Sequence, residues 1–118
     1  MVDGGKIINP QAAKNQVSGA VIGGIGMALM EERILDKHLG SIIGDDFAGY
    51  HFSVNSDAPI VEVDFINKPD FNSNPLGSKG IGEVGIIGSA AAISNAIYNA
   101  IGVRCRDLPI FPEKLVVQ

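Results

Sequence analysis

The sequence has one cysteine, no tryptophan and no cluster of basic residues among its 118 residues. The single cysteine, Cys105, cannot form an internal disulfide, and it cannot supply the several thiolates that an iron–sulfur cluster or a zinc site takes from a protein. Lys and Arg number 9 against 13 Asp and Glu, which gives a formal net charge of −4. Because nucleic acids are bound through clustered Lys and Arg, we exclude a nucleic-acid partner.

The apolar stretch from Val17 to Met30 is too short to indicate a membrane span. A spanning helix needs about 18 or more apolar residues, and charges at Lys14 and Glu31 bracket this stretch closely. The first residues are not basic and no cleavage-like segment follows them, so no signal peptide is visible. We therefore expect no membrane partner and a cytoplasmic protein, with a periplasmic complex as the alternative.

The composition is that of one globular domain. Hydrophobic residues make up 46% and charged residues 19% of the chain, and this length allows one modest core. His38, His51 and Cys105 lack the spacing of metal ligands. We expect a single domain over residues 1–118 that builds no metal site of its own.

Hydrophobic periodicity and turn residues predict an α+β fold, in which two main helices pack on a small sheet. The first helix is expected from about Pro10 to Leu35, because Asn9 can cap its free N–H groups and Pro10 has no N–H to lose. The second is expected from Val84 to Ile101, ended by Gly102. The other expected elements are strands at Lys6–Ile8 and Ile60–Ile66, an extended stretch at Tyr50–Val54, a long loop at Asn67–Lys79 and an extended tail at Leu108–Pro112.

The first predicted helix carries glycines at positions 19, 23, 24 and 26, each of which costs about 1 kcal/mol relative to alanine in a helix interior. A helix that keeps them must gain from the close approach of another surface. At helical spacing, one face carries a single amide above small residues: Gln16, Gly19, Ala20, Gly23 and Met27. We expect this face to lie against another chain or against the second helix.

The segment Lys79-Gly80-Ile81-Gly82-Glu83 places one carboxylate beside two glycines where the second helix begins. Gly80 and Gly82 have no Cβ, so a bulky ligand can approach the backbone closely, and the free N–H groups at the helix start point toward it. Glu83 would stand at the mouth of such a site. The simpler interpretation is that Glu83 only caps or stabilises the helix start.

The same glycines, continued to Gly85, also match the Gly-x-Gly-x-x-Gly pattern of dinucleotide-binding folds. That pattern requires a strand that leads directly into the first glycine within a strand–helix–strand unit. Here Pro75 and a polar loop separate the glycines from the strand expected at Ile60–Ile66, and no clear strand follows the second helix. A nicotinamide- or flavin-binding fold is therefore not predicted.

With its flanks, this segment resembles the C-terminal active-site segment of the molybdenum hydroxylases, the xanthine dehydrogenase and aldehyde oxidase family. Three groups of residues carry the resemblance, occur in the family's order and span nearly the whole chain. They are Ile8-Asn9-Pro10 with Gln16-Val17-Ser18-Gly19 and the stretch Gly24–Glu32; Lys79-Gly80-x-Gly82-Glu83; and Tyr50 with Asp57-Ala58-Pro59 and Arg106-Asp107-Leu108-Pro109. The stretch Asn74-Pro75-Leu76-Gly77 and the alanine-rich helix look closest to bacterial aldehyde oxidoreductases.

The resemblance implies a role for each matching residue. Glu83 corresponds to the family's catalytic base, and Gln16, Lys79, Gly80 and Gly82 are expected to contact the cofactor. The implied reaction is hydroxylation of a small-molecule substrate, an aldehyde or an N-heterocycle, with water as the oxygen donor. The implied cofactor is a molybdopterin-type molybdenum cofactor held by the full complex. The implied partners are the rest of the molybdopterin-binding subunit and iron–sulfur and FAD modules or subunits.

The resemblance covers only the last active-site part of such a subunit, so we expect residues 1–118 to be a C-terminal piece of it, inactive and without cofactor when alone. Its small-residue face would then be exposed unless association, including homo-oligomer formation, covers it. The alternative function is a non-catalytic interaction module that keeps the family fold and oligomerises through this face. The alternative for Lys79 is an ordinary solvated lysine beside the loop. Tyr50 and His51 are expected to be structural or surface residues.

Overall fold

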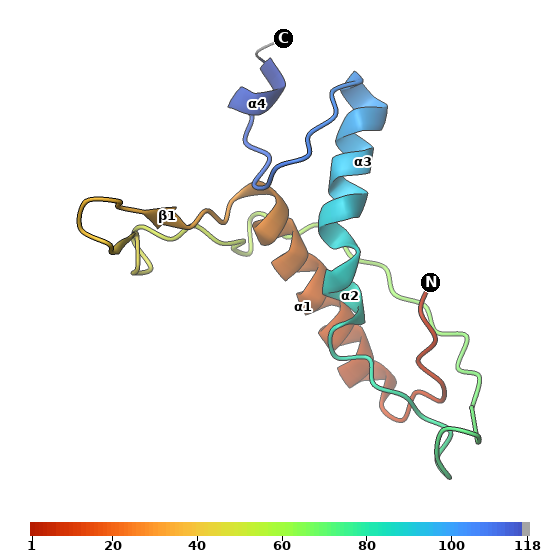
Figure 1. Cartoon of the computed structure of the whole chain (residues 1–118). Coiled ribbons are helices and arrows are strands. Elements are labelled where there is room, and N and C mark those ends of the chain that lie inside the picture. Colours follow the sequence, from red (N-terminus) through yellow and green to blue (C-terminus); the bar gives the residue numbers. More distant parts are fainter. Residues whose placement is uncertain (117–118) are drawn as a thin grey trace.

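The computed structural model describes residues 1–116, and its main feature is a pair of helical segments packed on one another (Figure 1). Helix α1 spans Pro10–Leu29, α2 spans Val84–Ile87 and α3 spans Ser89–Ile101. The remaining elements are the strands β1 (Ile34–Leu35) and β2 (Ile42–Ile43) and a final helical turn, α4 (Glu113–Val116). The predicted α+β class with two main helices is confirmed, while the position of the sheet differs from the prediction.

Helix α1 begins at Pro10, as predicted, and Asn9 caps it. The Asn9 side-chain oxygen accepts a hydrogen bond from the Ala12 N–H at 3.0 Å. Pro10 occupies the first turn, where its missing N–H costs nothing. Local chemistry alone therefore fixes this end of the helix.

The other end of α1 lies at Leu29, so the prediction of a helix to Leu35 was wrong. The Glu31 N–H still donates to the Gly26 carbonyl at 2.9 Å, but the chain then turns away. The Glu31 carboxylate accepts a hydrogen bond from the Tyr50 hydroxyl at 2.7 Å. This tertiary contact joins residues far apart in sequence, and local helix propensity cannot anticipate it.

The C-terminal tail packs on the end of α1. Ile110 is 2% exposed, and its N–H donates to the Ala28 carbonyl at 2.7 Å. The Lys114 ammonium donates to the Pro109 carbonyl at 2.6 Å within the tail. The tail predicted to be extended thus docks on this chain's own first helix and ends in α4, which was not predicted.

Part of the small-residue face of α1, together with the neighbouring Gly24, lies against α2 and α3. A Cβ built on Gly24 would come within 2.4 Å of the Ser89 Cβ, and one built on Gly85 would come within 2.9 Å of the Ala20 Cβ. Glycine at these positions lets the two helical segments approach this closely. The second helix thus covers the Ala20 and Gly23 part of the predicted face, whereas its other members are exposed: Gln16, Gly19 and Met27.

The second helical segment is interrupted at Gly88, and it ends at Gly102 in a left-handed conformation with φ 75°. Over Val84–Ile101 its mean hydropathy is 1.4, which makes it long and apolar enough, by length and composition only, to cross a membrane. Only 6% of this stretch is buried in the part of the chain that the structure describes. The outer face of α3 is therefore an uncovered apolar surface within residues 1–116.

The small sheet is a two-stranded hairpin that projects away from the helix pair (Figure 1). Its strands are antiparallel, with Ile34 opposite Ile43 and Leu35 opposite Ile42, and all four residues are exposed. The expected packing of the two main helices on a sheet is not observed in the described residues. Runs of only two apolar residues gave no strand signal in the sequence.

The predicted strand at Ile60–Ile66 is a single unpaired segment within residues 1–116. Its alternate residues Val61, Val63 and Phe65 are half-buried and those between them are exposed, which is the period of a one-sided strand. The alternation of burial agrees with the predicted pattern, but no segment within residues 1–116 pairs with it, so the predicted strand is not confirmed. The strand expected at Lys6–Ile8 is likewise replaced by an isolated bridge between Gly5 and Ser78.

The described residues form an open structure with a small core. The accessible surface is 8745 Å², against about 6,100 Å² for a compact protein of this mass. The radius of gyration is 17.9 Å, against roughly 13.5 Å for a compact domain of this length. The buried hydrophobic residues within residues 1–116 are Ala13, Ala28 and Ile110. Much of the apolar surface is therefore available for contact with other polypeptide.

Candidate functional site

The loop Gly80–Gly82 leads directly into α2, and Glu83 stands at the junction. Glu83 occupies the N-cap position of α2 with φ −113° and ψ −3°, and its exposed side chain makes no capping hydrogen bond. The simpler interpretation, in which Glu83 only caps the helix, finds no hydrogen bond to support it. The carboxylate is free to accept a proton or a ligand.

Gln16 of α1 lies beside this loop. A Cβ built on Gly82 would lie 3.9 Å from the Gln16 Nε2, while one built on Gly80 would meet nothing within 4 Å. Gln16 is exposed, so its amide lies outside the contact between the helices. The fold thus brings Gln16 next to Gly82 and its neighbour Glu83, with open space over the glycines.

A hollow of about 270 Å³ adjoins Gln16 at the start of α1. Gln16, Lys79 and Ile81 line it, together with residues that surround the first turn of the helix. Gly80, Gly82 and Glu83 do not line it, although they lie next to it in the chain. Of the predicted site residues, Gln16 and Lys79 therefore line this hollow, and Gly80, Gly82 and Glu83 follow Lys79 outside it.

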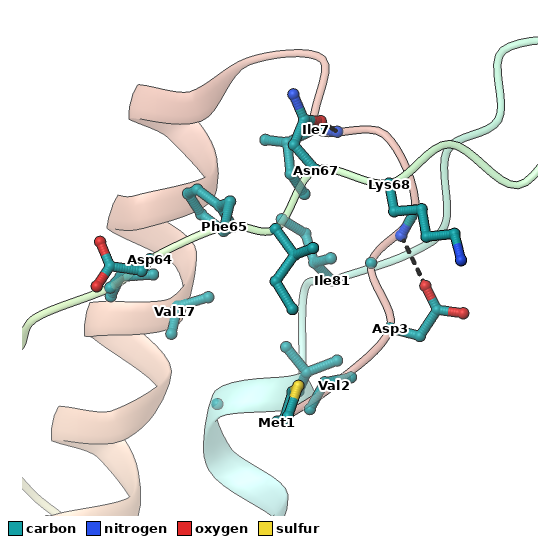
Figure 2. A pocket seen from close by; sticks show the side chains of 16 residues that line it. Met1, Val2, Asp3, Ile7, Val17, Asp64, Phe65, Asn67, Lys68 and Ile81 are labelled. Carbon is teal, nitrogen blue, oxygen red and sulfur yellow. Dashed lines mark hydrogen bonds between the residues drawn. The ribbon is translucent and has the colours of Figure 1, made fainter.

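Ile81 also lines a larger cavity of about 480 Å³ (Figure 2). Its walls include Val17 of α1, Phe65 of the unpaired segment and the N-terminal residues Met1 and Val2. Its lining includes neither Gln16 nor Glu83, so we do not place the chemistry in it despite its greater size. It lies along the end of the unpaired segment, since residues 63–68 are part of its lining.

The Lys79 ammonium is held between two carboxylates. Its Nζ lies 2.5 Å from the Asp3 Oδ2 and 2.7 Å from the Asp70 Oδ2. We call these three residues the lysine node. Sequence reasoning missed both carboxylates, because Asp3 lies 76 residues from Lys79 and no local pattern links the two.

Backbone hydrogen bonds reinforce the lysine node. The Gly77 carbonyl accepts hydrogen bonds from the Lys6 N–H at 2.7 Å and the Asp70 N–H at 3.0 Å. Gly77 has φ 68°, and a Cβ there would come within 2.8 Å of the Pro69 Cβ, so both its conformation and its surroundings favour glycine. Asn74 adds a hydrogen bond from its Nδ2 to the Ser78 carbonyl at 2.7 Å. The long loop predicted here is thus an ordered support for the residues before Glu83.

The contacts of the node shift the pKa of each member. Hydrogen bonding to Lys79 lowers the pKa of both Asp3 and Asp70 below the usual 3.8. Hydrogen bonding to Asp3, and then to Asp70, raises the pKa of Lys79 above its usual 10.5. A lowered carboxylate pKa stabilises the folded state above the unfolded pKa, and this contribution is lost as pH falls through the folded value. The node is therefore complete at neutral pH and opens only in acid below about pH 4 or in alkali above the usual lysine pKa.

Within the described residues, no group of three or more His, Cys, Asp and Glu side chains could hold a metal ion. The residues before Gly80 form an isolated bridge, and no strand–helix–strand unit is present in residues 1–116. The glycine pattern therefore lacks the structural setting of a dinucleotide site.

This glycine loop, with its uncapped carboxylate, belongs to the segment whose sequence resembles the molybdopterin-binding part of the molybdenum hydroxylases. Comparison with known proteins gives the same class, since the profile of the molybdopterin cofactor-binding domain family matches residues 1–59. The chain belongs to this family, as a molybdopterin-binding segment of a molybdenum hydroxylase. The predicted resemblance is confirmed.

Two relatives illustrate the similarity. The aldehyde oxidoreductase molybdenum-binding subunit PaoC of Escherichia coli (strain K12) is 48% identical over 112 residues, which cover 95% of this chain. The putative xanthine dehydrogenase molybdenum-binding subunit XdhA of the same strain is 40% identical over 115 residues, which cover 96% of the chain. In both cases the chain spans 15% of the relative's length.

Solved structures match the fold. The Cu,Mo-CO dehydrogenase superposes with a TM-score of 0.82 at 27% identity, over 96% of this chain and 14% of that chain. Quinoline 2-oxidoreductase from Pseudomonas putida 86 superposes with a TM-score of 0.78 at 29% identity, over 92% of this chain and 14% of that chain. The open architecture is therefore one that segments of much longer proteins adopt.

Proposed function

We propose that this chain is the C-terminal active-site segment of a molybdenum-binding subunit that hydroxylates an aldehyde or an N-heterocycle with water as the oxygen donor. In this proposal Glu83 is the catalytic base, and Gln16, Gly80 and Gly82 form the wall that meets the cofactor. The observation that carries the proposal is the exposed, uncapped Glu83 carboxylate beside open glycines and Gln16. Its experimental test is the Glu83→Gln variant described in the Discussion.

The residues of this wall fit a molybdopterin-type cofactor. Space over Gly80 and Gly82 admits a bulky group to the backbone, and the Gln16 amide offers both donors and an acceptor beside it. The wall has no cluster of metal ligands in the described residues, which suits a metal that arrives on its own pterin. When bound, the cofactor supplies the redox chemistry by taking up the two electrons that leave the substrate as it is hydroxylated.

Glu83 supplies the proton acceptor. An ionised carboxylate has only acceptor oxygens, and no hydrogen bond from the helix start occupies those of Glu83. It can therefore take the proton from the water whose oxygen enters the product. A positioned general base of this kind typically contributes about 10² to 10⁴ in rate.

We expect the isolated 118-residue chain to bind no molybdenum cofactor at useful affinity. Gln16, Gly80, Gly82 and Glu83 make one wall, and a ligand site usually buries most of its ligand. Elemental analysis of the purified chain should find molybdenum far below one atom per chain. Stoichiometric molybdenum would contradict this prediction.

We propose that the rest of the molybdenum-binding subunit covers the apolar surfaces that residues 1–116 leave open, with iron–sulfur and FAD modules as further partners. The outer face of α3 and the unpaired segment Ile60–Ile66 are such surfaces. Unpaired backbone N–H and C=O groups next to half-buried Val61, Val63 and Phe65 suit a neighbouring strand. The missing neighbour would then come from the remaining polypeptide.

Hydrogen exchange of the Val61–Ile66 amides tests this partner assignment. In the isolated chain these amides should exchange at nearly the rate of an unstructured peptide, because they have no hydrogen-bonded partner in residues 1–116. In the complete subunit they should exchange more slowly by about a hundredfold or more. Rapid exchange in both contexts would show that no strand pairs with this segment, and the α1 amides serve as the protected control.

The second candidate is a non-catalytic module that oligomerises through its exposed apolar surface. The large accessible area of 8745 Å² is the observation that favours it. The two candidates differ in what purifies with the chain. Co-purification of the remaining subunit together with molybdenum and pterin supports the catalytic segment, whereas a stable homo-oligomer without either supports the module.

A further inference from the structure

We infer that Lys79 is a positioning residue, which holds the glycine loop so that Glu83 stands ready for proton transfer, with Asp3 and Asp70 as its anchors. This inference rests on the proposed function, because it takes Glu83 as the base. It assigns Lys79 a different task from the direct cofactor contact that the family resemblance implies.

The Lys79 side chain is directed toward two carboxylates. An ammonium group has three N–H donors, and two of them are used by Asp3 at 2.5 Å and by Asp70 at 2.7 Å. The Lys79 side chain is only 29% exposed. Only one donor remains for any contact with a cofactor, and the two ion pairs hold the ammonium at Asp3 and Asp70. The interactions of the Lys79 side chain are therefore those of the lysine node.

The loop that follows Lys79 has few contacts that fix its conformation. Only Gly80, Ile81 and Gly82 separate Lys79 from Glu83. Both glycines are exposed, and Gly80 has no neighbour at its Cβ position within 4 Å. Because glycine has the greatest backbone freedom, these residues do not hold their own conformation. The orientation of Glu83 depends on what anchors each end of the loop.

Each end of the loop is anchored differently. On the C-terminal side, Gly85 packs on α1, since a Cβ there would come within 2.8 Å of the Val17 carbonyl oxygen. On the N-terminal side, Lys79 is the last anchored residue, through its ammonium and through its N–H, which donates to the Gly4 carbonyl at 3.1 Å. The α2 anchor does not depend on Lys79, whereas loss of the ammonium leaves Lys79 held only by its backbone hydrogen bond to Gly4. Loss of the ammonium therefore frees the glycine loop selectively.

Amide hydrogen exchange of the 118-residue chain tests the anchoring without any cofactor. Lys79→Met keeps an unbranched side chain but removes the charge, and Lys79→Arg keeps both the charge and the donors. We expect exchange of the hydrogen-bonded amides of residues 77–79 to rise by about tenfold in Lys79→Met and to return toward wild type in Lys79→Arg, with α1 unchanged. Equal exchange of these amides in Lys79→Met and wild type would overturn the inference.

A pH profile tests the same pairs by a separate measurement. In the wild type, the Gly80 and Gly82 amide resonances should follow a titration below pH 3.8, because Lys79 lowers the pKa of Asp3 and Asp70. In Lys79→Met the titration should move up toward that usual value. Glycine resonances that do not respond to this titration would show that the node is not coupled to the loop.

The complete molybdenum-binding subunit tests the link to catalysis. Lys79→Met should lower kcat by about 10- to 100-fold with KM and molybdenum content nearly unchanged, because the freed loop misplaces the Glu83 side chain, while Gln16 keeps its position on α1 and the glycines remain without side chains. Lys79→Arg should restore most of kcat. Loss of molybdenum from Lys79→Met would instead show a direct cofactor contact. If Glu83→Gln keeps full turnover, the proposed function fails. The exchange experiment would still show whether Lys79 anchors the glycine loop.

Discussion

Replacing Glu83 with glutamine should lower the turnover of the complete molybdenum-binding subunit by about 10² to 10⁴ and leave its molybdenum content unchanged. Glutamine keeps the size and hydrogen-bonding reach of the side chain but cannot accept the proton. The Glu83 side chain makes no capping hydrogen bond whose loss would disturb α2. Steady-state kinetics, elemental analysis and a melting curve on one preparation measure the three quantities together.

Glu113→Gln is the matched control for this variant. Glu113 is an exposed glutamate in the first turn of α4, so its replacement also removes one charge at a helix start. Such a charge is worth about 0.3–1 kcal/mol of stability and should leave turnover nearly intact. If Glu83→Gln behaved like this control, with a small loss of stability and normal turnover, Glu83 would be a helix-terminal charge and not the base.

Two glycines of α1 should respond to alanine with opposite signs. Gly24→Ala should destabilise the fold by about 1–3 kcal/mol, because its Cβ would lie 2.4 Å from the Ser89 Cβ. The Ser89 hydroxyl is held by a hydrogen bond to the Gly85 carbonyl at 2.6 Å, so the serine cannot move aside freely. Gly19→Ala should stabilise α1 by about 1 kcal/mol, since a Cβ there meets nothing within 4 Å.

Thermal unfolding followed by circular dichroism measures both glycine variants, and each 1 kcal/mol shifts Tm by several degrees in a domain of about this size. A second substitution separates a clash from a change in helix propensity. Ser89→Gly removes the Cβ that Gly24→Ala meets, so the double variant should recover stability relative to the sum of the single changes. Additive effects, or a stable Gly24→Ala, would show that α1 and α3 do not pack through this contact.

Local chemistry made the start of α1, the end of α3 and the glycine loop predictable. Asn9 and Gly102 act on their own neighbours along the chain, and the Glu83 motif is contiguous. The lysine node was not predictable, because Asp3 and Lys79 meet only in the folded chain. The early end of α1 was missed for the same reason, since the partner of Glu31 is the distant Tyr50.

The sheet shows a different limit of sequence reasoning. The alternation in Ile60–Ile66 correctly identified a segment with one half-buried face, and periodicity contains no information on which strand lies beside it. The hairpin of β1 and β2 has strands of two residues each, too short for any periodic signal. Pairing is a property of distant segments, and no segment within residues 1–116 pairs with Ile60–Ile66.

The unpaired segment Ile60–Ile66 also bears on how copies of this chain behave toward one another. An open strand edge with apolar residues is a common starting point for aggregation. Here Glu62 and Asp64 project from the exposed side, between the half-buried Val61, Val63 and Phe65. Like charges set opposite one another destabilise strand pairs, so two copies of this segment repel when aligned in register. A neighbour without acidic residues opposite Glu62 and Asp64 meets no such repulsion, and the edge thereby discriminates against self-association.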